Sequence, residues 1–317
     1  MRAVQFFEYG DASMLKIVDV DTPAPTAGQV LVRVSATSVN PVDIAVRRGE
    51  MRMLSGHRFP QGLGIDIAGV VAEVGANVTA FVPGDRVWGV KAGLFTRASG
   101  AAAEFMVIDA RLLSSIPANI DLIDSAALPA VGVTAVTAVG DKARVVATSR
   151  VLIRGAAGGV GSAAVQYAHS LGAHVTALAS ERNMRFVLDL GADVALNRAT
   201  TPVVDLGDFD AIIDTVGSEL LQLRRHLSPN GRMVTIAVGS LGSIAAVAFS
   251  AIYGPRRIRA FFGQPPRGVL AQLTEIVQAE GIMPVIEEIY PLERIADAHR
   301  AAEAGGGRGK RVIRIGV

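Results

Sequence analysis

The chain has 317 residues, half of them hydrophobic, and a formal net charge of +2. This length predicts about two domains, and the hydrophobic content excludes a mainly disordered chain. The basic residues are dispersed, so we expect no nucleic-acid or membrane partner, and the absence of cysteine excludes disulfides, thiolate nucleophiles and cysteine-ligated zinc.

We expect neither a secretory leader nor a membrane span. The first seven residues lack the basic region, apolar run and cleavage site of a secretory leader. The most apolar late segment, residues 244–253, is too short to cross a bilayer. We therefore expect a cytoplasmic protein.

The first 115 residues are typical of β-structure. Short runs rich in Val and Ile alternate with turn signals such as Val82-Pro-Gly-Asp85. The sequence Asn40-Pro-Val-Asp43 favours the start of a helical turn, with Asn40 as its cap. This spacing predicts a compact barrel-like domain. The expected strands cover residues 3–7, 15–20, 30–36, 67–74, 86–90 and 102–108.

After residue 116 the pattern alternates between helices and strands, which predicts a parallel, doubly wound sheet. A turn is expected at residues 228–231. Expected strands cover 151–153, 174–179, 210–215 and 232–238, and expected helices cover 122–127, 130–143, 162–170, 182–190, 220–227 and 269–279. At the end of the chain, strand-like runs at 283–289 and 311–315 flank a helix at 292–304.

Residues 151–161, Val-Leu-Ile-Arg-Gly-Ala-Ala-Gly-Gly-Val-Gly, join a strand to a helix through a glycine-rich turn. Aligned with the dinucleotide fingerprint G-x-G-x-x-G, Ala156 takes the first glycine position, and Gly158 and Gly161 take the second and third. Gly159 and Val160 lie between them. Such a turn brings the backbone close to a pyrophosphate and directs a helix N-terminus at its charge. A turn needed only for packing is the alternative.

Several further motifs recur in the order and spacing of one family. They are Ser38-Val-Asn-Pro-Val-Asp43, Arg48-Gly49, Gly64-Ile-Asp-Ile-Ala-Gly-Val-Val71, Glu73-Val-Gly75, Pro83-Gly-Asp-Arg-Val87, Ala103-Glu-Phe105, Gly132-Val-Thr-Ala135 and Gly309-Lys-Arg-Val312. With the glycine turn, they make the chain resemble the medium-chain dehydrogenase/reductase superfamily, in its zinc-free, quinone oxidoreductase-like (zeta-crystallin-like) branch. The resemblance implies an α/β fold: a GroES-like catalytic barrel from residues 1–118 and 265–317, with a Rossmann NADP-binding domain at 119–264 inserted between its parts.

The resemblance implies no metal. The zinc alcohol dehydrogenases of the superfamily have a cysteine at the position of Asn40 and a His-Glu pair at the positions of Ile65 and Asp66. Isoleucine cannot ligate zinc, and a catalytic zinc usually needs three protein ligands. Asp66 and His57 alone do not make a site. We expect Asp66 to hold a turn or to pair with an arginine.

The end of the second Rossmann strand favours NADPH over NADH. An NAD-specific site usually has a carboxylate there, whereas this chain has Ser180, followed by Arg182 and Arg185. The resemblance also places Arg198 where a residue stacks over the adenosine. Glu181, one residue after Ser180, complicates this interpretation. Its carboxylate either faces solvent or competes for the ribose. The alternative for Arg182 and Arg185 is a solvated helix face.

The resemblance implies hydride transfer from NADPH to a quinone or an activated α,β-unsaturated carbonyl. The catalytic candidate is Asn40, which the family places beside the nicotinamide. Its amide can donate a hydrogen bond to a developing oxyanion. The alternative is that Asn40 only caps the helix that follows it. Thr134 is expected to contact the cofactor. The alternative is that its hydroxyl is buried and hydrogen-bonded to its own helix. Val238 and Gly239 are expected to face the carboxamide, because ligands bind at the carboxyl ends of such strands.

Departures from the family pattern indicate a roomy, apolar substrate pocket. No tyrosine follows Gly49, and Ala102 stands where an aromatic residue often precedes the Ala-Glu-Phe motif. We expect Asn40, Met51 and Phe95 to line the pocket.

The sequence therefore predicts an NADPH:quinone oxidoreductase or enone reductase, acting on a small molecule. Two alternatives stay open. One is the reduction of a specific biosynthetic enone or ketone. The other is an NADPH-binding redox sensor without turnover. The apolar region 240–262 and the resemblance favour a homodimer.

Overall fold

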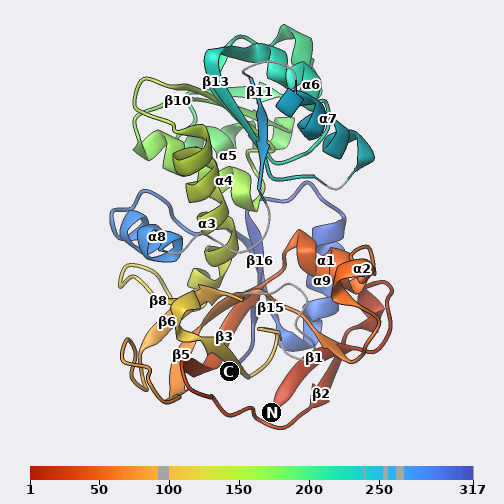
Figure 1. Cartoon of the computed structure of the whole chain (residues 1–317), viewed down its shortest axis with the longest axis vertical. Helices are drawn as coiled ribbons and strands as arrows, with labels where there is room; N and C mark the ends of the chain where they lie inside the picture. The colour runs from red at the N-terminus through yellow and green to blue at the C-terminus, as the bar shows by residue number, and fades with distance from the viewer. Residues whose placement is uncertain (92–99, 239, 253–255, 262–267, 317) are drawn as a thin grey trace. The chain divides into compact units, whose positions relative to one another are not determined.

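The computed structural model describes residues 1–91, 100–238, 240–252, 256–261 and 268–316. These residues form two compact units (Figure 1). The first unit comprises residues 1–130, 266–278 and 286–317, and the second comprises residues 131–265 and 279–285. The segment 279–285 of the second unit interrupts the C-terminal part of the first.

The first unit is built mainly from antiparallel strands. Its strands are β1 (Arg2–Phe6), β2 (Lys16–Asp19), β3 (Gln29–Ser38), β4 (Gln61–Gly62), β5 (Asp66–Val74), β6 (Arg86–Val90), β7 (Phe105–Asp109), β8 (Leu113–Ser115), β15 (Ile286–Pro291) and β16 (Lys310–Arg314). Its helices are α1 (Pro41–Arg47), α2 (Arg52–Ser55), α8 (Val269–Gln278) and α9 (Ile295–Glu303).

The large sheet of this unit has the strand order β15-β16-β3-β5-β6-β8, with β7 also paired to β3. Strand β16 runs antiparallel to β3, so that Val312 lies opposite Ser38. The C-terminal strands therefore complete the N-terminal sheet, as the resemblance implies. Inward-facing side chains fill the interior, among them the fully buried Phe6, Ile67, Trp88 and Met106.

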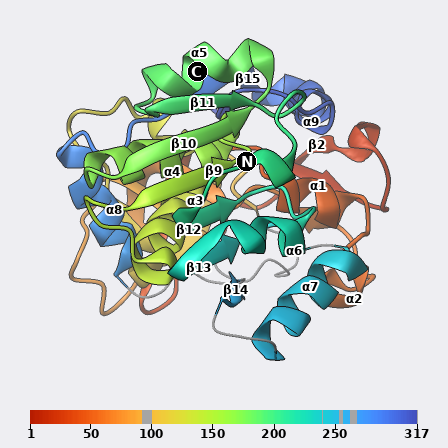
Figure 2. The ribbon, with the colours of Figure 1, turned by 90° about the horizontal axis from the view of Figure 1, so that it is seen from above.

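The second unit is a doubly wound sheet of six parallel strands in the order β11-β10-β9-β12-β13-β14 (Figure 2). The strands are β9 (Arg150–Arg154), β10 (His174–Ala179), β11 (Val194–Asn197), β12 (Phe209–Asp214), β13 (Leu227–Thr235) and β14 (Ile258–Ala260). The helices are α4 (Gly159–Ser170), α5 (Met184–Asp189), α6 (Leu220–Leu223) and α7 (Leu241–Ile252), and α3 (Pro129–Val136) begins at the boundary between the units. The central strands are continuous apolar runs, because helices cover both faces of a parallel sheet. The α/β fold class predicted from the sequence is confirmed.

Some predicted elements differ from the structure. The turn expected at 228–231 lies inside β13 rather than between two elements: Leu227 pairs with Phe209 and Arg232 with Ala211, and the four residues between form a bulge in which Gly231 lies close to Ser228. The helix expected at 122–127 is a 3₁₀ turn at Asp124–Ala127. The helix expected at 220–227 ends sooner, since α6 gives way to a 3₁₀ turn at Arg224–His226. The helix expected at 130–143 changes to π-helical geometry at Thr137–Ala143.

No described helix is long and apolar enough to cross a membrane. The apolar segment noted in the sequence forms α7, which has 12 residues.

Candidate functional site

The glycine-rich turn of the second unit lies between β9 and α4. Gly155 has φ +74°, and a Cβ there would lie 2.2 Å from Thr215 Oγ1, so only glycine fits. A Cβ on Gly161 would lie 2.2 Å from the Gly155 carbonyl oxygen. These two glycines are therefore required by the close packing of the turn against the first turn of the helix.

Gly158 differs from both, because a Cβ there would meet only the Gly155 oxygen, at 3.5 Å. Its Cα thus faces open space at the N-cap of α4, where no side chain caps the helix. The first N–H groups of a helix have no acceptor within it. Gly159, Val160 and Gly161 supply these groups here, while Ala156 is buried and its N–H donates to the Leu178 carbonyl at 3.4 Å. The turn has the backbone donors and the clearance that a pyrophosphate needs.

The next candidate residues follow β10. The Ser180 hydroxyl is buried and has no hydrogen-bond partner among the described residues. A buried hydroxyl without a partner costs free energy, so its presence here indicates a ligand atom or water. Glu181 is exposed, in agreement with the alternative that its carboxylate faces solvent.

The arginines near this strand end lie in different settings. Arg185 Nε pairs with Asp189 Oδ1 at 2.9 Å across one turn of α5, and its side chain is exposed. Arg182 is exposed at the 3₁₀ turn that follows Ser180. Arg198 is also exposed, and its backbone N–H donates to the Ala179 carbonyl. Its backbone therefore lies beside the end of β10.

Two other cofactor candidates of the second unit are described. Thr134 lies on α3 and is partly buried. Val238 follows the end of β13 and is partly buried. Gly239 lies outside the described residues, as does the pocket candidate Phe95.

The structure also brings together a charged network that the sequence analysis missed. Arg154, the last residue of β9, pairs with Asp214 Oδ1 at 3.5 Å and with Glu219 Oε2 at 2.5 Å. Asp214 is fully buried at the end of β12 and accepts hydrogen bonds from Thr235 Oγ1 and from the Gly217 N–H, both at 2.8 Å. In the sequence, the position of the Asp214 carboxylate at the end of a buried strand was the feature that could have identified this network. The network ties the carboxyl ends of three adjacent strands together.

In the first unit, the asparagine candidate lies in a buried network of polar side chains. Asp66, fully buried at the start of β5, accepts at Oδ2 from Asn40 Nδ2 (2.8 Å) and from the Ser38 hydroxyl, and at Oδ1 from the Ala130 N–H (2.7 Å). The Lys310 ammonium lies 3.4 Å from Asp66 Oδ2. The expectation that Asp66 pairs with an arginine is wrong: the cation is Lys310, which β16 carries beside β3.

All hydrogen-bonding groups of the Asn40 side chain are engaged. Its Nδ2 donates to Asp66 and, at 3.3 Å, to the Ser38 carbonyl, while its Oδ1 accepts from Lys310 Nζ at 2.5 Å. Asn40 also caps α1 through its backbone, because its N–H donates to Asp43 Oδ2 at 2.9 Å. Donation to a substrate oxygen would require the amide to leave one of these acceptors, so that role stays a prediction.

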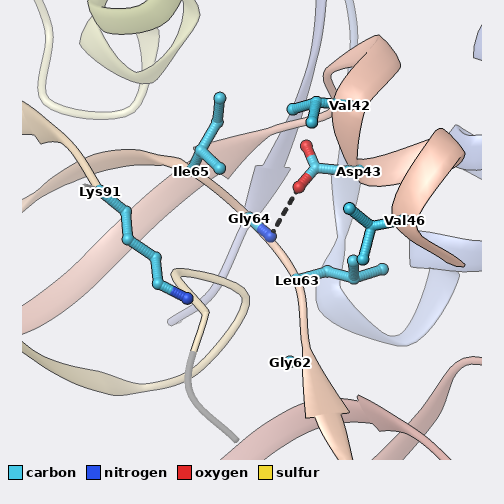
Figure 3. Close-up of a pocket in the computed structure, with 8 residues that line it drawn as sticks. All are labelled: Val42, Asp43, Val46, Gly62, Leu63, Gly64, Ile65 and Lys91. Carbon is cyan, nitrogen blue, oxygen red and sulfur yellow. Dashed lines mark hydrogen bonds between the residues drawn. The ribbon is translucent and has the colours of Figure 1, made fainter. Parts of the chain in front are cut away.

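A small cavity lies next to this network, and Asp43 and Lys91 are its ionisable groups (Figure 3). Aliphatic side chains and glycine backbone form the rest of its lining: Val42, Val46, Gly62, Leu63, Gly64 and Ile65. Asp43 Oδ1 accepts from the Gly64 N–H at 3.0 Å. Burial raises the pKa of the Asp43 carboxyl to about 6, against the opposing effect of its hydrogen bonds.

The sequence analysis did not select Lys91 or Asp43. Burial lowers the pKa of the Lys91 ammonium, and the neighbouring Asp43 charge opposes that shift. Met51 packs against the barrel core rather than lining this cavity. His57, which was set aside as a loop residue, is exposed.

The residues at the expected zinc positions do not fit a zinc ion. The Lys310 ammonium hydrogen-bonds Asn40 Oδ1 and pairs with the Asp66 carboxylate, and the side chain of Ile65 has no atom that can ligate a metal. Within the described part of the chain, no group of three or more His, Cys, Asp or Glu side chains is arranged to hold a metal. A zinc ion here would have to displace an ammonium from its carboxylate.

Comparison with known proteins identifies relatives over the whole chain. The alcohol dehydrogenase GroES-like domain matches residues 26–118, and a zinc-binding dehydrogenase family matches residues 190–313. The chloroplast envelope quinone oxidoreductase homolog of Arabidopsis thaliana is 31% identical, with 99% of this chain and 98% of the relative covered. The mitochondrial NAD(P)H oxidoreductase RTN4IP1 of Danio rerio is 32% identical over 90% of this chain and 84% of the relative.

Among solved structures, the quinone oxidoreductase from Coxiella burnetii has the same fold. Its TM-score to this chain is 0.90, with 30% sequence identity over 100% of this chain and 99% of the other.

Proposed function

Because the chain belongs to the medium-chain dehydrogenase/reductase superfamily, in its quinone oxidoreductase-like branch, we propose that it is an NADPH-dependent, zinc-independent oxidoreductase. Its substrates would be quinones or activated α,β-unsaturated carbonyls. The observation that carries the cofactor assignment is the pairing of an open glycine cradle at Gly158 with a buried, unpartnered hydroxyl at Ser180. Both lie at the carboxyl edge of one parallel sheet, which is where such sheets bind nucleotides.

The cradle would hold the pyrophosphate through backbone N–H groups of α4, helped by the positive end of the helix dipole. Ser180 would donate to the 2′-phosphate, and Arg182 would supply positive charge beside it. Strand β10 is followed by Ser180 rather than by a carboxylate, and the side chain of the next residue, Glu181, is exposed to solvent. When bound, NADPH would supply a hydride to the substrate.

The chain's own contribution on the substrate side would come from the first unit. The Asp66–Asn40–Lys310 network fixes the start of α1, and this in turn holds Asp43 and Val42 at the cavity. The aliphatic lining would exclude water from the reacting atoms. An oxygen that gains negative charge in such a site needs a donor or a cation.

The test is oxidation of NADPH against 1,4-benzoquinone, 9,10-phenanthrenequinone, an alkenal and an α,β-unsaturated acyl thioester. NADH and a metal chelator serve as controls. We expect turnover of a quinone or the alkenal, a preference for NADPH, and no effect of the chelator. Tight binding of NADPH without turnover of any member would contradict the reductase assignment and favour a redox sensor, or an enzyme for one biosynthetic enone.

We also propose that the protein is a homodimer. Strand β14 is one of the two edges of the described sheet, and α7 exposes apolar side chains that include Leu241 (87% exposed) and Ile252 (75%). A second copy would cover this surface and pair with the edge strand. Light scattering at micromolar concentration should give twice the chain mass. A monomer under those conditions would overturn the proposal.

A further inference from the structure

Four arginines gather at one edge of the sheet in the second unit. Arg232 lies on β13, and Arg259 lies on the edge strand β14 (Figure 2). Arg257 directly precedes β14, and Arg144 caps the end of the π-helical segment. These four residues are called the arginine cluster below.

The register of the two strands places Arg232 and Arg259 on the same face of the sheet. Met233 pairs with Ile258, and both are buried in the apolar core that includes side chains of α6 and α7. Side chains alternate along a strand, so those of Arg232 and Arg259 leave the sheet on the opposite face. The π-helical segment packs against β13, and Arg232 Nη1 donates to its Lys142 carbonyl at 3.5 Å. The end of this segment therefore borders the face that carries the arginines.

The charges of the arginine cluster act on one another. Burial lowers the pKa of the Arg259 guanidinium, and the charges of the three other arginines lower it further. Arginine stays protonated in spite of such a shift, so the repulsion persists at neutral pH. Arg259 Nη1 donates to the Arg257 carbonyl at 3.3 Å, which turns its side chain back toward the cluster.

No carboxylate forms an ion pair with the arginine cluster within the described part of the chain. Asp210 pairs with Arg150 at the start of β9. Asp141, on the π-helical segment, lies near Tyr167, and burial together with the Asp141 charge raises the pKa of that phenol. The segments outside the described residues contain no Asp or Glu. The cluster thus concentrates positive charge that a bound anion would compensate.

The backbone of Arg144 supports this interpretation. Its conformation is left-handed, with φ 56° and ψ 50°. Glycine is the usual residue at such a helix end, because a side chain is unfavourable in this conformation. The position carries an arginine against the preference of its backbone, and this arginine adds a fourth charge to the cluster.

We propose that the arginine cluster is an anion site that binds a short chain of two or three phosphates, either free or as part of a nucleotide. Neighbouring strands lie about 4.8 Å apart and alternate residues of one strand about 6.6 Å apart, so the arginines of β13 and β14 start within about 8 Å of each other. Each guanidinium can form paired N–H···O bonds with a phosphate. A phosphate chain supplies several negative charges within this span, whereas a monovalent ion would leave most of the repulsion.

The site is separate from the proposed cofactor site of the same unit. Arg232 is in register with Ala211 near the amino ends of the strands, whereas the glycine turn follows the carboxyl end of β9. Two strands lie between β9 and β14, which puts these two strands about 14 Å apart. The site also uses side chains on the face of the sheet, and not the backbone edge of β14 that the proposed homodimer would use. The inference goes beyond the proposed function and does not depend on it.

The test measures binding of tripolyphosphate and of ATP by calorimetry, without divalent metal, at an ionic strength of about 0.15 M. Saturating NADPH keeps both probes out of the glycine cradle, and the Gly158→Ala protein gives the same separation if NADPH does not bind. We expect the Kd of tripolyphosphate to be at least about 10-fold below that of sulfate. Equal affinity for the two probes would assign the site to the phosphate chain alone, and tighter binding of ATP would assign it to a nucleotide.

Arg232→Gln combined with Arg259→Gln should weaken tripolyphosphate binding at least about 10-fold. Without the anion this double variant should melt no lower than the wild type, because it removes charges that repel each other. Arg144→Gly suits the backbone at that position and should weaken binding about 3-fold or more. Arg52→Gln combined with Arg58→Gln removes two exposed arginines from the first unit and should leave binding unchanged.

Three results would overturn the inference. The first is failure of the wild type to bind either probe. The second is equal weakening of binding in the Arg52→Gln, Arg58→Gln control. The third is binding that Gly158→Ala abolishes and the arginine variants retain, because the anion would then occupy the glycine cradle.

Discussion

Asn40 Oδ1 accepts a hydrogen bond from Lys310 Nζ at 2.5 Å, although 270 positions separate the two residues in the chain. The same ammonium donates to the Val39 carbonyl at 2.9 Å and lies 3.4 Å from Asp66 Oδ2. Each of its three N–H groups thus has an acceptor nearby, which compensates for its burial. This contact ties the last strand of the chain to the helix start beside the cavity.

Replacing Lys310 with methionine should destabilise the first unit. The change leaves the fully buried Asp66 carboxylate without its cation, and breaking a buried pair costs about 3–5 kcal/mol. Trp88 is the single tryptophan of the chain and is fully buried in this unit, so its fluorescence during urea unfolding reports the change. Adding Asp66→Asn to Lys310→Met should recover part of the loss, since it removes the unpaired charge. Equal unfolding midpoints for wild type and Lys310→Met would contradict this account.

Two glycine substitutions should separate packing from ligand binding in the turn after β9. Gly158→Ala places a methyl group in open space, so thermal stability should stay within about 1 kcal/mol while NADPH affinity falls at least about 10-fold. Gly161→Ala forces a contact with the Gly155 carbonyl and should cost about 1–3 kcal/mol of stability. Thermal melts and NADPH fluorescence titrations measure both effects. Normal NADPH binding by a stable Gly158→Ala protein would argue against the cradle.

Ser180→Asp should reverse the cofactor preference. The new carboxylate would repel the 2′-phosphate of NADPH and accept from the ribose hydroxyl of NADH. We expect the ratio of Kd for NADPH to Kd for NADH to rise about 10-fold or more, equivalent to about 1.4 kcal/mol. Glu181→Gln is the matched control: Glu181 is exposed, so this change should leave the ratio nearly constant. A constant ratio in Ser180→Asp would show that the buried hydroxyl does not face the phosphate.

His299 should make the first unit sensitive to acid. Burial, helped by the charge of Arg47, lowers the pKa of this α9 side chain to about 3 from 6.5. Between these values the unfolded chain binds a proton that the folded state does not, so stability falls as the pH falls below about 6.5. The loss from this group should reach about 2 kcal/mol between pH 7.5 and pH 5.

The variant His299→Gln should have a flatter dependence of unfolding free energy on pH, whatever its stability at neutral pH. Urea unfolding followed through Trp88 at several pH values gives this slope. The exposed His57→Gln variant serves as the control and should keep the wild-type slope. A slope in His299→Gln as steep as that of the wild type would show that this histidine is not the sensitive group.

Local patterns in the sequence determined the main elements and the nucleotide turn. Hydrophobic runs of strand length predicted β5, β6, β10 and β12, because such runs are buried in any sheet. Glycine at residues 172 and 191 marked two helix ends, and both have the positive φ that favours glycine. The turn after β9 was recognised since its strand, glycines and helix are contiguous, and all its constraints act within about ten residues.

The tertiary structure decided the partners of the charged side chains. Nothing near Asp66 in the sequence indicates that a lysine 244 positions later supplies its cation, because β16 reaches β3 only when the sheet closes. Lys91 and Asp43 likewise line one cavity although they are distant in the chain, because β5 pairs with β6 and Asp43 accepts from the Gly64 N–H. The turn predicted from Ser-Pro-Asn-Gly lies inside β13, because the residues on both sides of it pair with β12. Burial and charge depend on neighbours that are distant in the chain, and these neighbours exist only in the folded protein.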